Sequence, residues 1–259
     1  MTEEQRYLID INGYIVVPQA LDERVVATLL DEWQQKTRGK NLTDVSFNWG
    51  EAWRSLIDNP AVLDVVIECF SGQVRLDHAF CVTERFGNKD WRMHHQAGMF
   101  DKGLYYGIQH GKIHVGLIGV IYSLVETHLP DKGVGGFCCI PGSHKASFEI
   151  PEHFFMIKNN PHVQRVPQKP GDAIIFIEAL THGTYLSEGR FPRRSIMIKY
   201  MPGYATFRQP YNTLAVTRTS PTPGYPHDDG DGAVDESLLN EKQRRLVTEP
   251  AYARGKTYL

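Results

Sequence analysis

The 259-residue sequence is poor in cysteine and carries no excess of charge of either sign. It has four cysteines, none of them in a CxxC pair, and 28 basic residues against 30 acidic ones. This cysteine usage favours reduced thiols over disulfides or a cysteine-based metal clip. The balanced charge gives no electrostatic reason to expect a nucleic acid or a charged membrane as a partner.

The sequence also lacks a long apolar run. No stretch approaches the roughly 18 consecutive apolar residues that a membrane-spanning helix requires, and the N-terminal MTEEQRYLID is acidic, unlike a secretory or mitochondrial leader. We therefore expect a soluble, cytoplasmic protein; the sequence predicts no particular oligomeric state. The composition, 41% hydrophobic and 22% charged, is that of an ordinary globular protein long enough to bury a sizeable core.

Helical patterns dominate the first 73 residues. Residues 21–37 place apolar side chains at i, i+1, i+4, i+5 and i+8, which is one stripe of an amphipathic helix. A second helix is expected at 59–70, where Pro60 stands at a first-turn position. Between the start of the chain and the first of these helices, the β-branched run at 13–17 predicts a short strand.

From about residue 74 the sequence becomes strand-like. Segments rich in Val, Ile, Phe and Tyr are separated by clusters of Gly, Pro, Asn and Asp: VRLDHAFCVTERF, KIHVGLIGVIYSLVE, GGFCCIPG, DAIIFIEAL and RSIMIKYMPG. We predict a mainly β fold with flanking helices, a sandwich or barrel. One domain would span 1–259, with a helical part at 1–73, a β core at about 74–203 and a polar excursion at 204–259.

One segment, 171–200, suggests chemistry. A Pro-Gly-Asp turn leads into a strand that ends at His182, and Arg193 and Arg194 follow eleven and twelve residues later at the start of another strand. An antiparallel pair of strands would bring one histidine and one arginine into the same cavity. This suits a metal-bound ligand that also has a distant carboxylate, because the guanidinium fork binds carboxylates bidentately. Taken alone, a histidine at a strand end is more typical of a hydrogen-bonded structural residue.

The hairpin GGFCCIPGSHK (135–145), combined with the GD–F–H–R block just described, resembles the phytanoyl-CoA dioxygenase-like branch of the iron(II)/2-oxoglutarate oxygenases. The resemblance runs from GYIVVPQALD to about Tyr200. It implies a double-stranded β-helix, or jelly roll, for the core, with iron held by an H-x-D…H facial triad. The cofactors implied are iron(II), 2-oxoglutarate as cosubstrate, and O2.

The same resemblance assigns roles to several residues. His182 matches the distal metal-binding histidine, and Arg193 matches the residue that binds the far carboxylate of 2-oxoglutarate. Arg194 is the second choice, because it would project to the other side of the strand. Tyr122 is expected to face the cosubstrate, and His144 of the PGSHK motif is expected to be structural.

The first half of the triad is where the sequence departs from the family pattern. WRMHHQAGMF (91–100) supplies adjacent histidines, only one of which can face a metal from a strand. If His95 is the ligand, Ala97 stands at the acid's position; if His94 is the ligand, Gln96 stands there. Neither arrangement has an Asp or Glu at that position.

Three consequences compete. A carboxylate from elsewhere, with Asp90 and Asp101 nearest in sequence, completes the triad of a dioxygenase that hydroxylates an aliphatic carbon of a small molecule, releasing succinate and CO2. Alternatively, chloride fills the vacant position and the enzyme is a halogenase. In the third case, the site has lapsed and the domain only binds a ligand. We rank an active enzyme ahead of a lapsed site, since both histidines and the arginine pair are present. We rank the oxygenase ahead of the halogenase, since Gln96 at the acid's position would occupy part of the space for chloride, and we expect no catalytic residue beyond the metal site.

Overall fold

The computed structural model describes residues 1–84, 92–94, 103–129, 134–187, 191–205 and 234–247. The chain begins with α1 (Glu3–Asn12), which the sequence patterns above did not predict. Its start is marked by a capping box between Thr2 and Gln5, and it ends at Gly13, whose φ of 80° is left-handed. The expected strand follows as β1 (Tyr14–Val17).

Both helices expected from the sequence are present. The first is α2 (Glu23–Thr37), capped by the Asp22 side chain. The second is α4 (Pro60–Cys69), with its proline in the first turn as predicted. The remaining helices are short: α3 (Glu51–Arg54), α5 (Glu241–Leu246) and the 3-10 turns η1 (Phe47–Trp49), η3 (Ser143–Lys145), η4 (Glu152–Phe155) and η5 (Glu236–Leu238). Among the described helices, none has the length and apolar character needed to cross a membrane.

The β core is built from two antiparallel sheets. The larger has the strand order β1-β9-β6-β11-β3-β2, with β2 (Leu42–Asp44), β3 (Val74–Glu84), β6 (Ile118–Ser123), β9 (Ala173–Ile177) and β11 (Arg193–Pro202). The smaller has the order β10-β7-β8, with β7 (Gly136–Cys139), β8 (Gln164–Arg165) and β10 (His182–Tyr185). A separate hairpin joins β4 (Tyr106–Gln109) and β5 (Lys112–Val115). This is the mainly β architecture with flanking helices that the sequence predicts.

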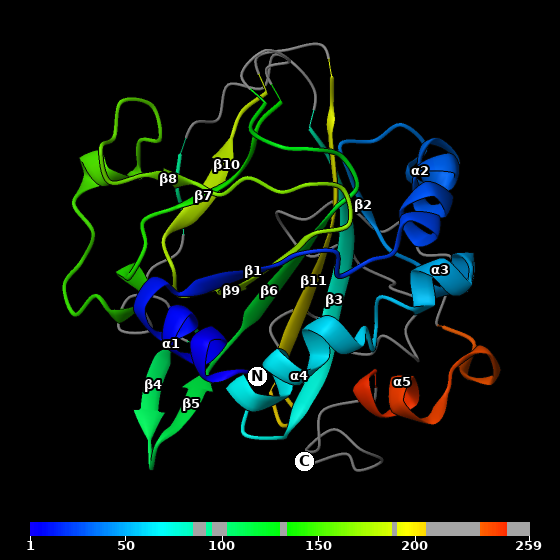
Figure 1. Ribbon diagram of the computed structural model, residues 1–259, viewed down its shortest axis with the longest axis horizontal. Coiled ribbons are helices and arrows are strands. Elements are labelled where there is room, and N and C mark those ends of the chain that lie inside the picture. The colour runs from blue at the N-terminus through cyan, green and yellow to red at the C-terminus, as the bar shows by residue number, and fades with distance from the viewer. Residues whose placement is uncertain (85–91, 95–102, 130–133, 188–190, 206–233, 248–259) are drawn as a thin grey trace, which may run out of the picture.

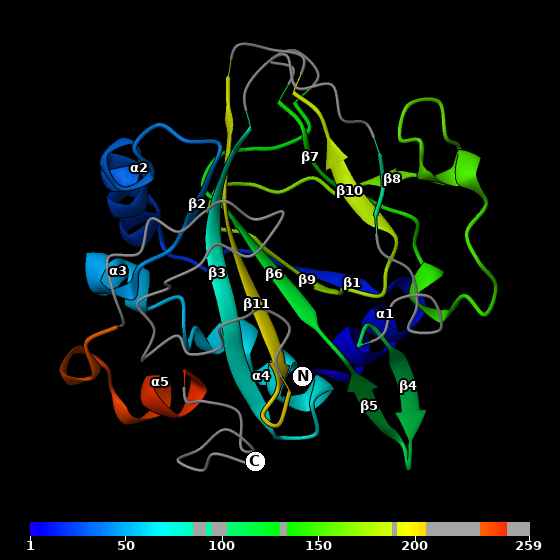
Figure 2. The ribbon, with the colours of Figure 1, turned by 180° about the vertical axis from the view of Figure 1, so that it is seen from behind.

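The two faces of the larger sheet have different neighbours. Helices α2, α3 and α4 lie on its outer side and the three-stranded sheet lies on the other, as opposite views show (Figures 1 and 2). Side chains such as Ile196 and Ile198 of β11 join Trp33 of α2 in the main hydrophobic core. The opposite face contributes Ile121 and Phe176, which pack against Phe137 of the smaller sheet. The space between the sheets is therefore reached by alternate residues of each strand.

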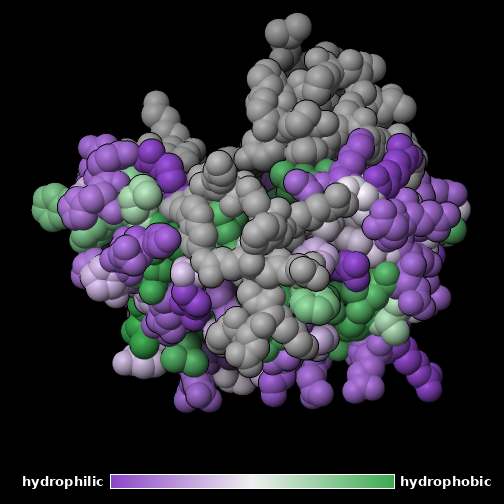
Figure 3. All heavy atoms as spheres, turned by 90° about the horizontal axis from the view of Figure 1, so that it is seen from above, coloured by the Kyte–Doolittle hydropathy of each residue, from purple (hydrophilic) through white to green (hydrophobic). Residues whose placement is uncertain are grey.

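On the face that Figure 3 shows, hydrophilic groups predominate at the periphery of the described part, and hydrophobic groups are visible between them and at one edge. All four cysteines are buried and free. Most of the predicted polar excursion at 204–259 lies outside the described residues, although η5 and α5 occupy the region at 235–247 where a last helical turn or two is expected.

Candidate metal and cosubstrate site

His94 and His182, both predicted metal ligands, lie side by side. Their backbones form an antiparallel bridge, in which the His94 N–H donates to the His182 carbonyl at 2.8 Å and the His182 N–H donates to the His94 carbonyl at 3.1 Å. Residues paired in this way present their side chains on the same face. The two imidazole ring centroids are 4.4 Å apart. His182 is buried, whereas His94 is exposed.

The His182 ring is held in one orientation. Its Nδ1 lies 2.6 Å from the carbonyl oxygen of Leu180, which can only accept, so Nδ1 carries the proton and donates. In the neutral ring the lone pair is then on Nε2, which lies 3.8 Å from Oε2 of Glu178. A backbone carbonyl on one ring nitrogen with the other left unprotonated is the arrangement that metal-binding histidines use. His182 therefore suits a metal ion without rearrangement.

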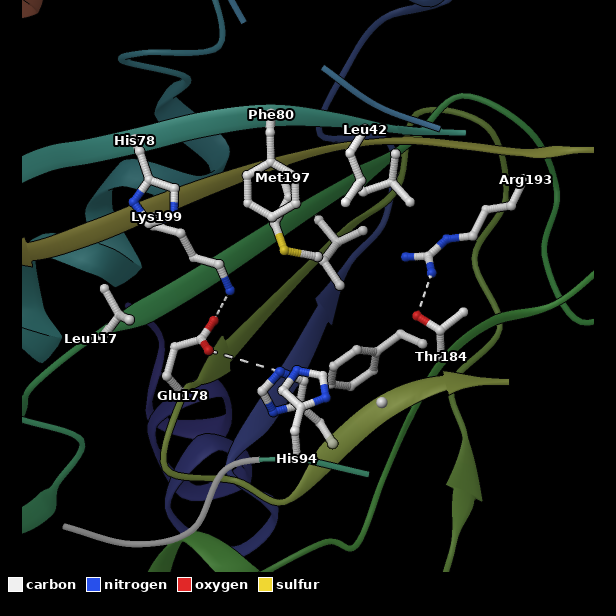
Figure 4. A pocket seen from close by; sticks show the side chains of 15 residues that line it. Leu42, His78, Phe80, His94, Leu117, Glu178, Thr184, Arg193, Met197 and Lys199 are labelled. Carbon is white, nitrogen blue, oxygen red and sulfur yellow. Dashed lines mark hydrogen bonds and ion pairs between the residues drawn. The ribbon is translucent and has the colours of Figure 1, made fainter. Parts of the chain in front are cut away.

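Both histidines line a cavity of about 220 Å³ between the two sheets (Figure 4). Its polar lining comes from His78, His94, Glu178, His182, Thr184, Arg193 and Lys199. Its apolar lining comes from Leu42, Phe80, Val82, Leu117, Ile121, Phe137 and Met197. An apolar chamber with a few converging polar groups is the usual form of a small-molecule site.

Arg193, the predicted cosubstrate residue, also lines this cavity. It is only 1% exposed, and it donates hydrogen bonds from Nε to Ser195 Oγ and from Nη1 to Thr184 Oγ1, each at 3.0 Å. These contacts hold a permanently charged group inside the fold, where an anionic ligand would compensate its charge. Figure 4 shows the guanidinium pointing toward Thr184 at the end of the cavity away from Lys199.

Two other candidates are not brought to the cavity. Arg194 is absent from the lining, as expected of a residue next to Arg193 on a strand, and its buried Nε has no hydrogen-bond partner among the described residues. Tyr122 is fully buried in the main core, whereas its neighbour Ile121 lines the cavity. The structure thus places Tyr122 on the face of β6 away from the site. Its buried hydroxyl has no hydrogen-bond partner in the described part of the chain, and burial raises its pKa well above the ordinary value.

The rest of the HHQAG motif lies outside the described residues. This holds for His95, Gln96 and Ala97, and for Asp90 and Asp101, the carboxylates nearest in sequence. Within the described ranges, no group of three or more His, Cys, Asp or Glu side chains stands ready to hold a metal ion. Among the described residues, two imidazoles therefore suit iron, and no third ligand already forms a complete metal-binding group with them.

Glu178 is a cavity residue that the sequence interpretation did not single out. It follows β9 directly and continues the alternation of Ile174 and Phe176, which face the smaller sheet. Its side chain is 2% exposed, and one carboxylate oxygen contacts Nζ of Lys199 on β11. The sequence did contain a signal for this residue, which is an acidic side chain at an inward-facing position directly after an apolar strand. Such a side chain is notable because a buried charge requires a partner.

Lys199 is also buried. It stands opposite His78 in the pairing of β11 with β3, and both side chains line the cavity. Burial lowers the pKa of Lys199 from its ordinary value to about 7. The Glu178 carboxylate acts in the opposite direction, because an adjacent negative charge stabilises the ammonium form.

His144 is structural in this fold, in line with its predicted role in the PGSHK hairpin. Its Nε2 lies 3.0 Å from the carbonyl oxygen of Asp10 in α1, and its ring packs edge-on against Tyr106. Burial lowers the pKa of His144 to about 4. The hairpin histidine thus joins α1 to the core, and it is absent from the cavity lining.

Comparison with known proteins identifies the family. Residues 40–195 match the family model described as phytanoyl-CoA dioxygenase (PhyH). The chain belongs to the phytanoyl-CoA dioxygenase family. No curated protein sequence matches it.

Solved structures agree in fold. Iron-bound HygX from Streptomyces hygroscopicus superposes with a TM-score of 0.71 at 20% identity, covering 91% of this chain and 96% of that one. SnoK, described as a non-heme α-ketoglutarate-dependent carbocyclase from nogalamycin biosynthesis, gives 0.60 at 16% identity and covers 80% and 87%. The epimerase SnoN of the same biosynthesis gives 0.58 at 19% identity and covers 80% and 82%.

These comparisons confirm the predicted family and the predicted cupin-like jelly-roll fold. They also confirm the predicted enzyme class, a member of an iron/2-oxoglutarate oxygenase family, and the expected iron(II), 2-oxoglutarate and O2 are the cofactors of that family. Epimerisation and ring formation among the structural neighbours mean that the fold does not by itself specify the reaction.

Proposed function

We propose that this protein is an iron(II)/2-oxoglutarate-dependent dioxygenase that hydroxylates an aliphatic carbon of a small molecule, with succinate and CO2 as co-products. One observation carries the proposal: the His94 and His182 rings, 4.4 Å apart, share a cavity with the buried Arg193. Two imidazoles and a guanidinium in one chamber match the needs of a metal and of a dicarboxylate cosubstrate.

Each residue has a distinct role in this proposal. His94 and His182 bind the iron, the latter through Nε2 because Nδ1 is committed to Leu180. Arg193 binds the far carboxylate of 2-oxoglutarate, and Thr184 and Ser195 keep its guanidinium in place. Bound iron and 2-oxoglutarate supply the oxidising chemistry, and the apolar walls formed by Phe80, Met197 and their neighbours exclude water from it.

The small-molecule substrate has support from proteins of similar fold. HygX has been crystallised with nickel, 2-oxoglutarate and hygromycin B, and SnoN with Fe3+, α-ketoglutarate and nogalamycin RO. A cavity of about 220 Å³ lined by both apolar and polar side chains accords with a compact organic ligand. We therefore propose a small organic substrate for this chain as well, and neither a nucleic acid nor a membrane as its partner.

The test is spectroscopic. Anaerobic protein mixed with iron(II) and 2-oxoglutarate should develop a weak visible charge-transfer band that is absent in His182→Ala. His153→Ala, which alters an exposed histidine, should keep the band. In air, the wild-type protein should convert 2-oxoglutarate to succinate. If the wild-type protein shows neither the band nor succinate formation with any substrate, it is a binding module and not an oxygenase.

A further inference from the structure

Glu178 and His182 face one another where the chain passes from the larger sheet to the smaller one. Glu178 follows β9, and His182 begins β10 four residues later. Glu178 Oε2 and His182 Nε2 are 3.8 Å apart, too far for a hydrogen bond. When His182 is neutral its proton is on Nδ1, and both facing atoms are then electron-pair donors. Two buried electron-pair donors that face each other form surroundings in which a cation is stabilised.

We propose that Glu178 supplies the metal carboxylate that the segment after His94 lacks, so that the iron ligands from the protein are His94, His182 and Glu178. This inference rests on the function proposed above. It departs from the H-x-D pattern of the family, because the acid comes from the strand that precedes the distal histidine and not from the segment that follows the first one.

The other contacts of Glu178 suit this role. Its Oε1 contacts Lys199 Nζ, which leaves Oε2 directed toward the histidines (Figure 4). A metal-bound carboxylate usually has its second oxygen held by a hydrogen-bond donor in this way. Gly119 of β6 leaves space for the Glu178 carboxylate because it has no side chain. A Cβ at that position would clash with the Phe176 ring and lie 2.6 Å from Glu178 Oε1, so a side chain there would displace both groups.

The geometry requires a modest adjustment. Neighbouring ligand atoms around a metal with bonds of about 2.1 Å lie roughly 3 Å apart, compared with 3.8 Å between Glu178 Oε2 and His182 Nε2. Glutamate has three side-chain torsions, and rotation about the last of them moves Oε2 with little effect on the backbone. As they stand, these three residues do not form a complete metal-binding group.

The competing explanation is that Glu178 only neutralises Lys199. Both explanations predict a buried ion pair, but they differ in metal affinity and in the number of ligand positions left open. If Glu178 is a ligand, its removal weakens metal binding and exposes a position to small anions. If it only pairs with Lys199, the metal site does not change when the carboxylate is removed.

The experiment is calorimetric titration of the full-length apoprotein with Co(II) and Fe(II). We expect Glu178→Gln to weaken metal binding at least tenfold, because altering a group that only supports a metal ligand already weakens it about 10–100-fold. Glu68→Gln, which removes a surface carboxylate paired with Arg6, is the matched control and should bind as the wild type does. His182→Ala should abolish tight binding.

A second readout uses anions. The charge-transfer band of the wild-type complex with iron(II) and 2-oxoglutarate should not respond to chloride or azide, whereas that of Glu178→Ala should shift with either. Gln96→Asp restores an acid at the family's position, and in the Glu178→Gln background it should recover the lost affinity. Glu178→Gln/Lys199→Met removes both charges of the buried pair and replaces the single variant if that variant does not fold.

The outcomes separate the two proposals. Wild-type metal affinity in Glu178→Gln, together with loss of binding in His182→Ala, would overturn the role of Glu178 and leave the oxygenase proposal intact. A wild-type band that already shifts with chloride would also overturn it, and would favour halide at the iron. Failure of the wild-type protein to bind either metal would refute both proposals.

Discussion

His94 and His182 are joined by a reciprocal pair of backbone hydrogen bonds, of 2.8 and 3.1 Å, so the placement of their imidazoles depends on main-chain pairing. A one-residue slip in this pairing would turn the neighbouring side chain toward the cavity instead. The described structure therefore brings His94 to His182, while His95 lies outside the described residues. The position of the two rings is set by the backbone before any metal binds.

Arg193 and Arg194 form a matched pair for testing cosubstrate binding. Arg193→Met should raise the Kd for 2-oxoglutarate about 10–100-fold, since a buried charge-assisted contact to a carboxylate is worth roughly 1.5–3 kcal/mol. The Kd of Arg193→Lys should lie between those of the wild type and Arg193→Met, because an ammonium is charged but cannot form the bidentate contact. The measurement is titration of the charge-transfer band with 2-oxoglutarate. Arg194→Met should change this Kd little, and an equal effect from both variants would contradict the assignment.

Tyr122 offers a test of which face of β6 reaches the cavity. Its hydroxyl is buried without a hydrogen-bond partner among the described residues, and such a group costs about 1–3 kcal/mol. Tyr122→Phe should therefore be neutral or stabilising in urea unfolding, with an unchanged Kd for 2-oxoglutarate. A clear loss of 2-oxoglutarate affinity would show that the tyrosine contacts the cosubstrate, as the sequence comparison suggested.

The pH dependence of stability should reflect buried histidines. The pKa of His144 is lowered from 6.5 to about 4 by burial, so the unfolded chain takes up a proton as the pH falls below about 6.5 while the folded chain stays neutral. The stability that this histidine contributes is fully present above about pH 6.5 and declines as the pH falls toward 4. At pH 5 the loss is about 2 kcal/mol. His128, whose pKa burial also lowers to about 4, should add a similar loss.

Urea unfolding at pH 7 and pH 5 measures this effect. The difference in unfolding free energy between the two pH values should shrink by about 2 kcal/mol in His144→Gln. His153→Gln, at an exposed position, should retain the full wild-type difference. A His144→Gln protein that loses as much stability on acidification as the wild type would show that this histidine is not the group responsible.

The Lys199–Glu178 pair predicts strong coupling in the metal-free protein. Lys199→Met leaves a buried carboxylate without its ammonium partner and should cost about 3–5 kcal/mol. Glu178→Gln/Lys199→Met replaces both charges with groups of similar size and should recover most of that loss. Denaturant unfolding of the single and double variants in the presence of a chelator supplies the measurement. Additive effects of the two substitutions would mean that the side chains do not interact.

The amino-acid sequence alone was sufficient for the local elements and for one half of the site. Helices α2 and α4 followed from apolar periodicity and from Pro60, because helix formation depends on residues within a few positions of each other. His182 and Arg193 do share a cavity, but the reason predicted for it was wrong: they begin β10 and β11, which are not antiparallel neighbours and belong to different sheets on either side of the cavity. The short helix α1 was missed, although a capping box marks its start.

Only the tertiary structure decided which faces meet. All six residues of β6 are buried, so its sequence carries no alternation to show whether Ile121 or Tyr122 faces the cavity. That choice depends on register with β9 and β11. The same pairing brings Glu178 and Lys199, 21 residues apart, into contact across the sheet. A buried charge is recognisable in a sequence, but its partner is selected by strand order, which no local pattern encodes.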